Sequence, residues 1–83
     1  MKRLPPIGTL CAVEWDDISA AINADLAEAA PIRCTTWGVL IRKADNFAVI
    51  ATSLFHSKPD AKPEGDFVSI PYGTIRRVKR VST

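Results

Sequence analysis

The sequence holds few of the residues on which catalytic and metal sites depend. Its 83 residues include one histidine, His56, and two cysteines, Cys11 and Cys34, and these three do not have the spacing of metal ligands. A nucleophilic pair of Cys34 and His56 would need a third group to orient it. The four glycines are scattered, so no glycine-rich loop cradles a phosphate. We therefore expect a protein that is not an enzyme and that binds neither a metal nor a cofactor.

Long apolar runs are also lacking. No run approaches the roughly 20 residues that cross a bilayer, and Pro5, Pro6 and Gly8 stand where a signal peptide would be apolar. We expect no membrane contact and a cytoplasmic location, in which both cysteines stay reduced as small buried side chains. The composition, 47% apolar and 24% charged, is ordinary for a soluble globular protein. A chain this short builds one domain with a thin core, so oligomerisation is expected to stabilise it.

The net charge of +2 hides an asymmetry along the chain. Residues 1–31 hold five acidic residues and two basic ones, whereas the remainder holds nine basic residues and four acidic ones. Four of the nine lie close together: Arg76, Arg77, Lys79 and Arg80. Such a basic end attracts phosphate or an acidic protein surface, or it is simply the solvated end of a strand.

Alternating apolar residues predict strands over most of the chain, and one segment has a helical period. The first strand is Thr9–Trp15. Apolar residues at helical spacing follow over Ile18–Ala30, where Asp16 or Asp17 would cap a helix and Pro31 would stop it. The central feature is a hairpin over Thr35–Phe55, with its turn at residues 44–46.

The second strand of this hairpin, residues 47–55, is apolar on both faces. A small sheet buries both faces of a strand only when it curls on itself, carries a helix or meets another subunit. The helix Ile18–Ala30 and a second copy of the chain are therefore both candidates to cover the second face.

The last third of the chain adds two strands after a polar loop over residues 56–65. The fourth strand is Asp66–Pro71, and residues 72–74 form a turn after it. From Ile75 on, every third residue is apolar, which suits one 3-10 turn before a short last strand, Arg77–Val81. The predicted fold class is mainly β (α+β): a five-stranded barrel with one short helix between strands 1 and 2. It is a single domain over residues 9–83, after a flexible N-terminal segment over residues 1–8.

Three motifs carry a resemblance to known families. Residues 66–78 resemble the end of an SH3-like barrel, where a strand meets an Ile-Pro step, makes one 3-10 turn and closes with a short strand. Gly38-Val39-Leu40, followed by Asp45-Asn46 and an apolar strand, is similar to the first signature of Sm and Sm-like RNA-binding proteins. Residues 13–81 also resemble small bacteriophage and prophage proteins of unassigned function. This resemblance lies in Val13-Glu14-Trp15-Asp16-Asp17, Thr36-Trp37-Gly38-Val39 and Ile70-Pro71-Tyr72-Gly73-Thr74-Ile75. Pro71-Tyr72-Gly73 replaces the Arg-Gly of the second Sm motif, so the Sm uridine pocket does not transfer.

The resemblance implies a self-assembling SH3-like or Sm-like binding module, in which neighbouring copies pair their fourth and fifth strands. The implied interface residues are Phe67, Val68, Ile70, Val78 and Val81. Both tryptophans, Trp15 and Trp37, are expected in the core.

RNA or single-stranded DNA is the predicted ligand, because basic side chains near an exposed aromatic neutralise phosphates and stack bases. The candidate binding residues are Arg42, Lys43, Tyr72, Arg76, Arg77, Lys79 and Arg80. Tyr72 suits a lid on the barrel equally well. The alternative function is that of a phage accessory or anti-defence protein that binds a host protein or sequesters a small nucleotide.

Overall fold

The structure is a computed structural model that describes residues 4–17, 31–55 and 64–81. Five β-strands and one short 3-10 turn account for most of these residues. The strands are β1 (Leu10–Asp17), β2 (Ile32–Lys43), β3 (Phe47–Phe55), β4 (Glu64–Pro71) and β5 (Ile75–Arg80), and the turn η2 (Tyr72–Thr74) joins β4 to β5. The prediction of a mainly β domain with five strands is confirmed.

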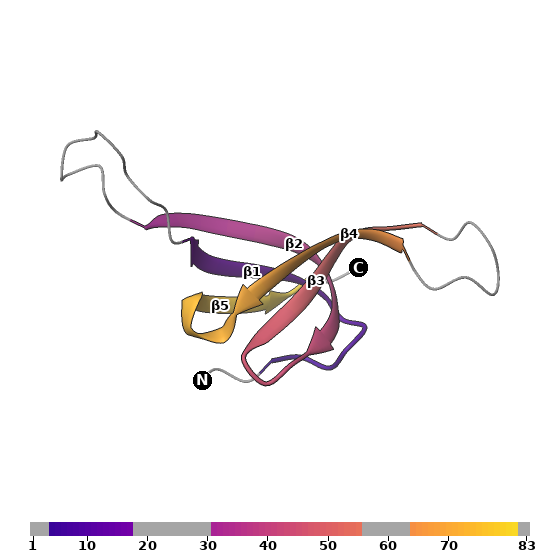
Figure 1. The fold of residues 1–83 in the computed structure, drawn as a ribbon, viewed down its shortest axis with the longest axis horizontal. Coiled ribbons are helices and arrows are strands. Elements are labelled where there is room, and N and C mark those ends of the chain that lie inside the picture. Colours follow the sequence, from indigo (N-terminus) through magenta and orange to yellow (C-terminus); the bar gives the residue numbers. More distant parts are fainter. Residues whose placement is uncertain (1–3, 18–30, 56–63, 82–83) are drawn as a thin grey trace.

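The five strands form one antiparallel sheet in the order β4-β3-β2-β1-β5 (Figure 1). Consecutive strands pair from β1 to β4, whereas β5 returns to the far edge and pairs with β1, placing Val78 opposite Val13. The pairing register shifts inside three of the four strand pairs, β1–β5, β2–β3 and β3–β4. Such bulges increase the local twist and bend, so the sheet curls.

The curl encloses a single core on the concave face of the sheet. Its buried members come from both halves of the curled sheet: Cys11, Val13, Leu40, Ala48, Ile50 and Ile70. Trp15, Val68, Ile75 and Val78 pack around them, as does Leu4 from the segment before β1. Figure 1 shows β3 and β4 crossing over β1 and β5, and this crossing is what allows Ile70 and Val13 to share one core.

Closure of the predicted barrel is not found. Within the described residues β4 and β5 do not pair with each other, so the sheet is curled but open. The predicted helix Ile18–Ala30 lies outside the described residues. The first two strands are also longer than predicted, because Asp16 and Asp17 continue the ladder opposite Arg33 and Ile32.

The doubly apolar strand is covered largely by its own chain. Ala48 and Ile50 lie in the core, while Val49 and Ala51 on the opposite face are also buried. Val49 lies between Ser69 of β4 and Arg42 of β2, which are its partners in the two neighbouring strands. Curling therefore buries one face of β3, and side chains of the neighbouring strands help to bury the other.

The prediction that Trp37 lies in the core is wrong, because its side chain is 62% exposed. Residues 37 and 40 face opposite sides of β2, and the core takes the side of Gly38 and Leu40. A Cβ atom on Gly38 would lie 2.3 Å from the backbone oxygen of Ala51, so only glycine lets β3 approach so closely. Trp15 does pack on the core, and its Nε1 donates to Thr36 Oγ1 at 2.9 Å.

Among the residues described, no helix has the length and apolar character needed to cross a membrane.

Candidate nucleic-acid interface

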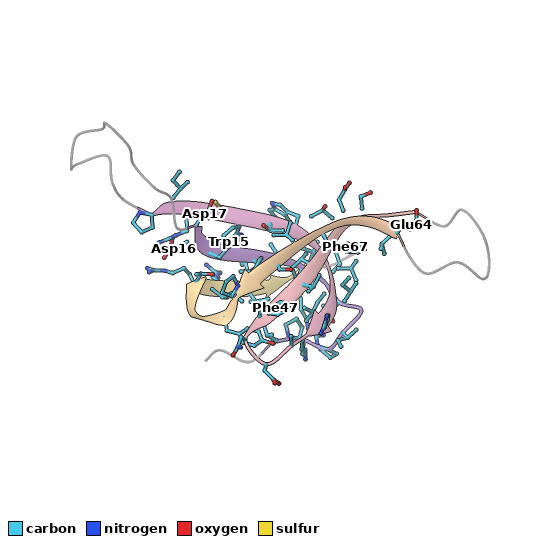
Figure 2. All side chains as sticks on the ribbon, in the orientation of Figure 1. Trp15, Asp16, Asp17, Phe47, Glu64 and Phe67 are labelled. Carbon is cyan, nitrogen blue, oxygen red and sulfur yellow. The ribbon has the colours of Figure 1, made fainter. Side chains whose placement is uncertain are left out.

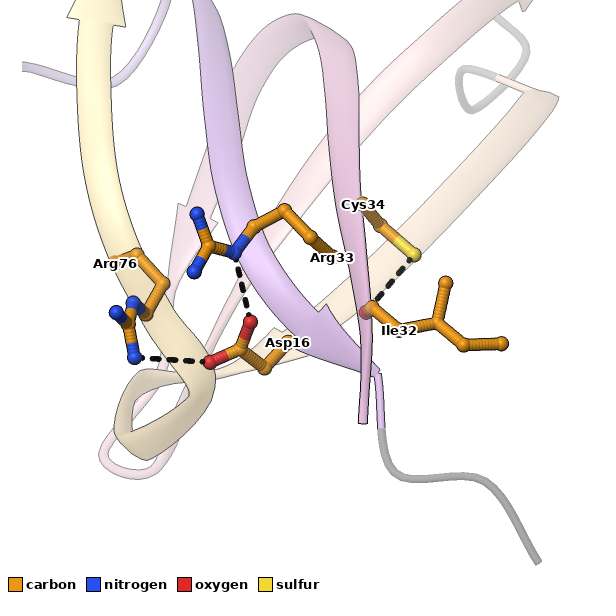
Figure 3. Close-up of polar contacts among 5 residues, drawn as sticks. All are labelled: Asp16, Ile32, Arg33, Cys34 and Arg76. Carbon is orange, nitrogen blue, oxygen red and sulfur yellow. Dashed lines mark hydrogen bonds and ion pairs between the residues drawn. The ribbon is translucent and has the colours of Figure 1, made fainter. Parts of the chain in front are cut away.

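Some of the basic residues of β5 form ion pairs with acidic residues of β1, and others do not. Asp16 accepts from Arg33 Nε at 2.9 Å and from Arg76 Nη1 at 3.3 Å (Figure 3). Arg77 Nε lies 3.8 Å from Glu14 Oε2. Ion pairs this exposed contribute at most about 1 kcal/mol each to stability, but they do cancel charge locally. Two acidic residues of β1 thus offset much of the positive charge expected at the start of β5.

The C-terminal end of β5 carries positive charge that no described acidic residue offsets. Arg80 and Lys43, at the last positions of β5 and β2, line one groove with a volume of about 540 Å³. Val78, Leu4, Pro5 and Pro6 complete the lining. No ion pair joins Lys43 or Arg80 to an acidic residue within the described parts of the chain. We call these six residues the basic groove.

The segment before β1 builds one wall of the basic groove. Gly8 N donates to Leu40 O at 2.7 Å, and Leu40 N donates to Thr9 O at 2.9 Å. The positive φ of Gly8, 95°, turns the chain here in a way that suits glycine. Residues 4–8, which the sequence indicated as part of a flexible segment, therefore make specific contacts with the sheet. The proline content that predicted a loose start instead gives a stiff apolar wall.

Tyr72 serves as a lid on the core. Its hydroxyl donates to Ala44 O at 2.5 Å and its backbone N–H donates to Asn46 O at 3.1 Å, which ties η2 to the β2–β3 turn. The half-buried ring packs against the core cluster. Of the two roles considered for Tyr72, the geometry therefore favours the lid over base stacking.

Replacing Tyr72 with phenylalanine is expected to lower the free energy of unfolding by about 1 kcal/mol, the usual net contribution of one hydrogen bond. Urea denaturation followed by circular dichroism measures this loss. Thr74→Val is the matched control, because the Thr74 hydroxyl donates to Pro71 O at 2.8 Å in an exposed position, where water replaces the lost bond. A larger loss for Thr74→Val would contradict the lid role of Tyr72.

The remaining candidates lie on the convex face of the sheet, opposite the core. The Arg42 guanidinium lies 5.8 Å from the centroid of the Phe47 ring, a cation–π contact at the hairpin end. Lys79 lies opposite Ala12 of β1. The structure thus brings Lys43 and Arg80 together, places Arg42 and Lys79 on the other face, and pairs Arg76 and Arg77 with acidic residues.

Three of the five predicted interface side chains point into the core. Ile70 is fully buried, and Val68 and Val78 pack against the same cluster. Phe67 faces outward from β4 (Figure 2) and is 45% exposed. Val81 N donates to Leu10 O at 3.0 Å, which extends the β5–β1 pairing by one residue. What β4 and β5 offer a neighbouring chain is therefore mainly their backbone edges.

The described residues hold no group of three or more histidine, cysteine or acidic side chains placed to bind a metal ion. Cys11 is fully buried, and burial raises the pKa of its thiol, which keeps it protonated and unreactive near neutral pH. The expectation that both cysteines are buried is wrong for Cys34, which is half-exposed and whose thiol donates to Ile32 O at 3.6 Å (Figure 3). Both cysteines are free. His56 lies outside the described residues.

Comparison with known proteins identified no matching family model, no similar curated protein and no similar solved structure.

Proposed function

We propose that this protein is a non-enzymatic binding module that holds the phosphates of single-stranded RNA or DNA in the basic groove. The observation that carries the proposal is that Lys43 and Arg80 line the same groove as the apolar residues Leu4, Pro5, Pro6 and Val78. An ammonium and a guanidinium group that line one groove suit a phosphate diester, and a guanidinium can bind two of its oxygens at once. Apolar walls lower the local dielectric, which strengthens the attraction.

Local charge selects this site over the rest of the basic cluster. Arg33, Arg76 and Arg77 share the two carboxylates of Asp16 and Glu14, so a phosphate near them meets negative as well as positive charge. In the basic groove, a phosphate meets the cations Lys43 and Arg80, and no acidic residue is among the lining residues. Sequence-independent binding of a nucleic-acid strand rests on this electrostatic attraction and weakens as salt rises.

The architecture supports an SH3-like or Sm-like barrel for this module. The meander from β1 to β4, the single 3-10 turn Tyr72–Thr74 and the return of β5 beside β1 are what such a barrel requires. Within the described residues β4 and β5 each have a strand neighbour on one side only. A homo-oligomer in which β4 of one copy pairs with β5 of the next would use both edges.

Replacing Arg80 with glutamine is expected to weaken binding and to make it less sensitive to salt. The measurement is fluorescence anisotropy with a labelled oligothymidylate or oligouridylate of about 12 nucleotides, within the usual site sizes of about 4–16. Each phosphate contact contributes about −0.7 to the slope of log affinity against log salt for a single strand, so losing one reduces the slope by about that amount.

Arg77→Gln is the matched control, because it removes the same charge three positions earlier on the same strand. Arg77 is paired with Glu14, so we expect a smaller change in the slope than for Arg80→Gln. Equal effects of the two variants would show that net charge and not the basic groove governs binding. A wild-type affinity that does not change with salt would overturn the proposed function.

A mononucleotide in the same assay separates strand binding from nucleotide sequestration. The volume of the basic groove, about 540 Å³, lies within the range of small-molecule sites. A strand-binding module is expected to hold the oligonucleotide far more tightly than the mononucleotide, because only the strand reaches further cations. Equal affinities would favour the sequestration of a small nucleotide.

A further inference from the structure

The convex face of the sheet carries an apolar row that crosses four strands. Leu10 of β1 lies opposite Val39 of β2, Val39 lies opposite Ala51 of β3, and Ala51 lies opposite Phe67 of β4. Residues directly opposite one another in adjacent strands place their side chains on the same face. Phe67 and Leu10, at the two ends of this row, are both substantially exposed.

A second row runs beside the first and ends in a cation. Trp37 of β2 lies opposite Ala12 of β1, and Ala12 lies opposite Lys79 of β5. Trp37 is two residues before Val39, so its indole shares the face of the first row. We call the two rows together the convex platform.

The low exposure of two alanines indicates the shape of the convex platform. Ala12 and Ala51 are each 4% exposed, although neither belongs to the core cluster. A methyl side chain is hidden so fully only where larger neighbours stand over it, and the neighbours in register are Trp37 and Lys79 for Ala12, and Val39 and Phe67 for Ala51. The platform is therefore a shallow floor of small side chains between two exposed aromatic rings.

Two cations share the face of the convex platform. Lys79 belongs to it, and Arg42 lies on the same face beside it, opposite Val49. The acidic residues on this face of β1, Glu14 and Asp16, are both in ion pairs with arginines. An anionic ligand with flat apolar parts matches an aromatic surface bordered by cations.

We propose that the convex platform stacks unpaired nucleic-acid bases, with Trp37 as the principal contact and Phe67 as the second. The inference rests on the proposed function and deepens it, because it assigns the bases a site separate from the phosphate site. Stacking on exposed aromatic side chains is tolerant of base identity, so the platform selects single strands without selecting a sequence. Lys79 and Arg80 are adjacent on β5 and face opposite sides of the sheet. The end of β5 is thus where a strand passes from the basic groove to the platform.

Tryptophan emission of the wild-type protein tests this assignment. Oligothymidylate is expected to quench the emission. Inorganic polyphosphate of similar length has no bases, so it is expected to bind the basic groove without quenching the emission. Trp37→Phe isolates the emission of Trp15, which is half-buried and hydrogen-bonded to Thr36, and in this variant the quenching is expected to disappear.

Affinities of Trp37→Ala and Trp37→Phe give an independent measure. Loss of one stacked base weakens single-strand binding by about tenfold to a hundredfold, so Trp37→Ala is expected to bind oligothymidylate at least about tenfold more weakly. Trp37→Phe is expected to recover most of that loss, while the affinity of both variants for polyphosphate stays that of the wild type. Because Trp37 is 62% exposed, both variants are expected to fold, and circular dichroism checks this.

The outcomes separate the two proposals. If neither oligothymidylate nor polyphosphate binds, the proposed function fails and the platform assignment fails with it. If both bind but Trp37→Ala changes neither affinity, the proposed function stands and the platform assignment is overturned. A wild-type dimer that Trp37→Ala converts to a monomer, with oligothymidylate affinity unchanged, would instead assign the platform to contact with a second copy.

Discussion

Replacing Gly38 with alanine is expected to lower the free energy of unfolding by about 3 kcal/mol, the upper part of the usual range for overpacking a core. The added Cβ atom would lie 2.3 Å from Ala51 O and 2.7 Å from Ile50 Cγ2. The first neighbour is backbone, so relief requires β2 and β3 to separate. Alanine restricts the unfolded chain and thereby stabilises by up to about 1 kcal/mol, which is too little to offset the clash.

Gly73→Ala is the matched control for this prediction. A Cβ atom at Gly73 meets nothing within 4 Å, so we expect a change within about 1 kcal/mol. Urea denaturation of both variants measures the difference. A small domain has roughly 5 kcal/mol of stability in total, so Gly38→Ala should be largely unfolded in mild denaturant. Equal stability of the two variants would mean that β2 and β3 do not approach so closely at Gly38.

Truncating Leu40 to alanine is the second change with a large expected effect, a loss of about 3 kcal/mol. Leu40 is 1% exposed and lies opposite Ile50 in the core, so its removal both loses buried apolar surface and leaves a cavity. Leu54→Ala removes the same atoms from a side chain that is 37% exposed, and we expect a loss of about 1 kcal/mol or less. Comparable losses at the two sites would contradict the placement of the core.

The strands of this chain are predictable from local pattern because their periods are clear. The hairpin turn over residues 44–46 follows from side-chain alternation and turn chemistry. The 3-10 turn lies at Tyr72–Thr74, before the position that the spacing from Ile75 indicated, and Ile75 already begins β5. Local pattern does not determine which face of β2 is buried in the core. The sequence analysis placed Trp37 in the core, whereas the core lies on the face of Gly38 and Leu40, where β3 comes close to Gly38.

The candidate site was predictable as a set of basic residues but not as a surface. Lys43 and Arg80 are brought together by the pairing of β1 with β2 on one side and β5 on the other, which no local pattern encodes. Asp16 suggested a helix cap in the sequence, yet its carboxylate binds Arg33 and Arg76 from two other strands. The exposed Trp37 was missed because a large aromatic residue in an apolar strand usually marks the core.

The return of β5 to β1 also determines when the domain can complete its folding. The hairpins that link β1 to β4 in sequence order join neighbouring parts of the chain, but Val13 meets its partner Val78 only after nearly the whole domain has been synthesised. Closing so long a loop costs more entropy than closing any of the hairpins and is expected to slow folding. Until then β1 exposes one unpaired edge, and Val13 has its neighbour Thr36 on β2 but not Val78 on the other side. During translation this interval is when the nascent chain is most open to chaperones and to pairing with other strands.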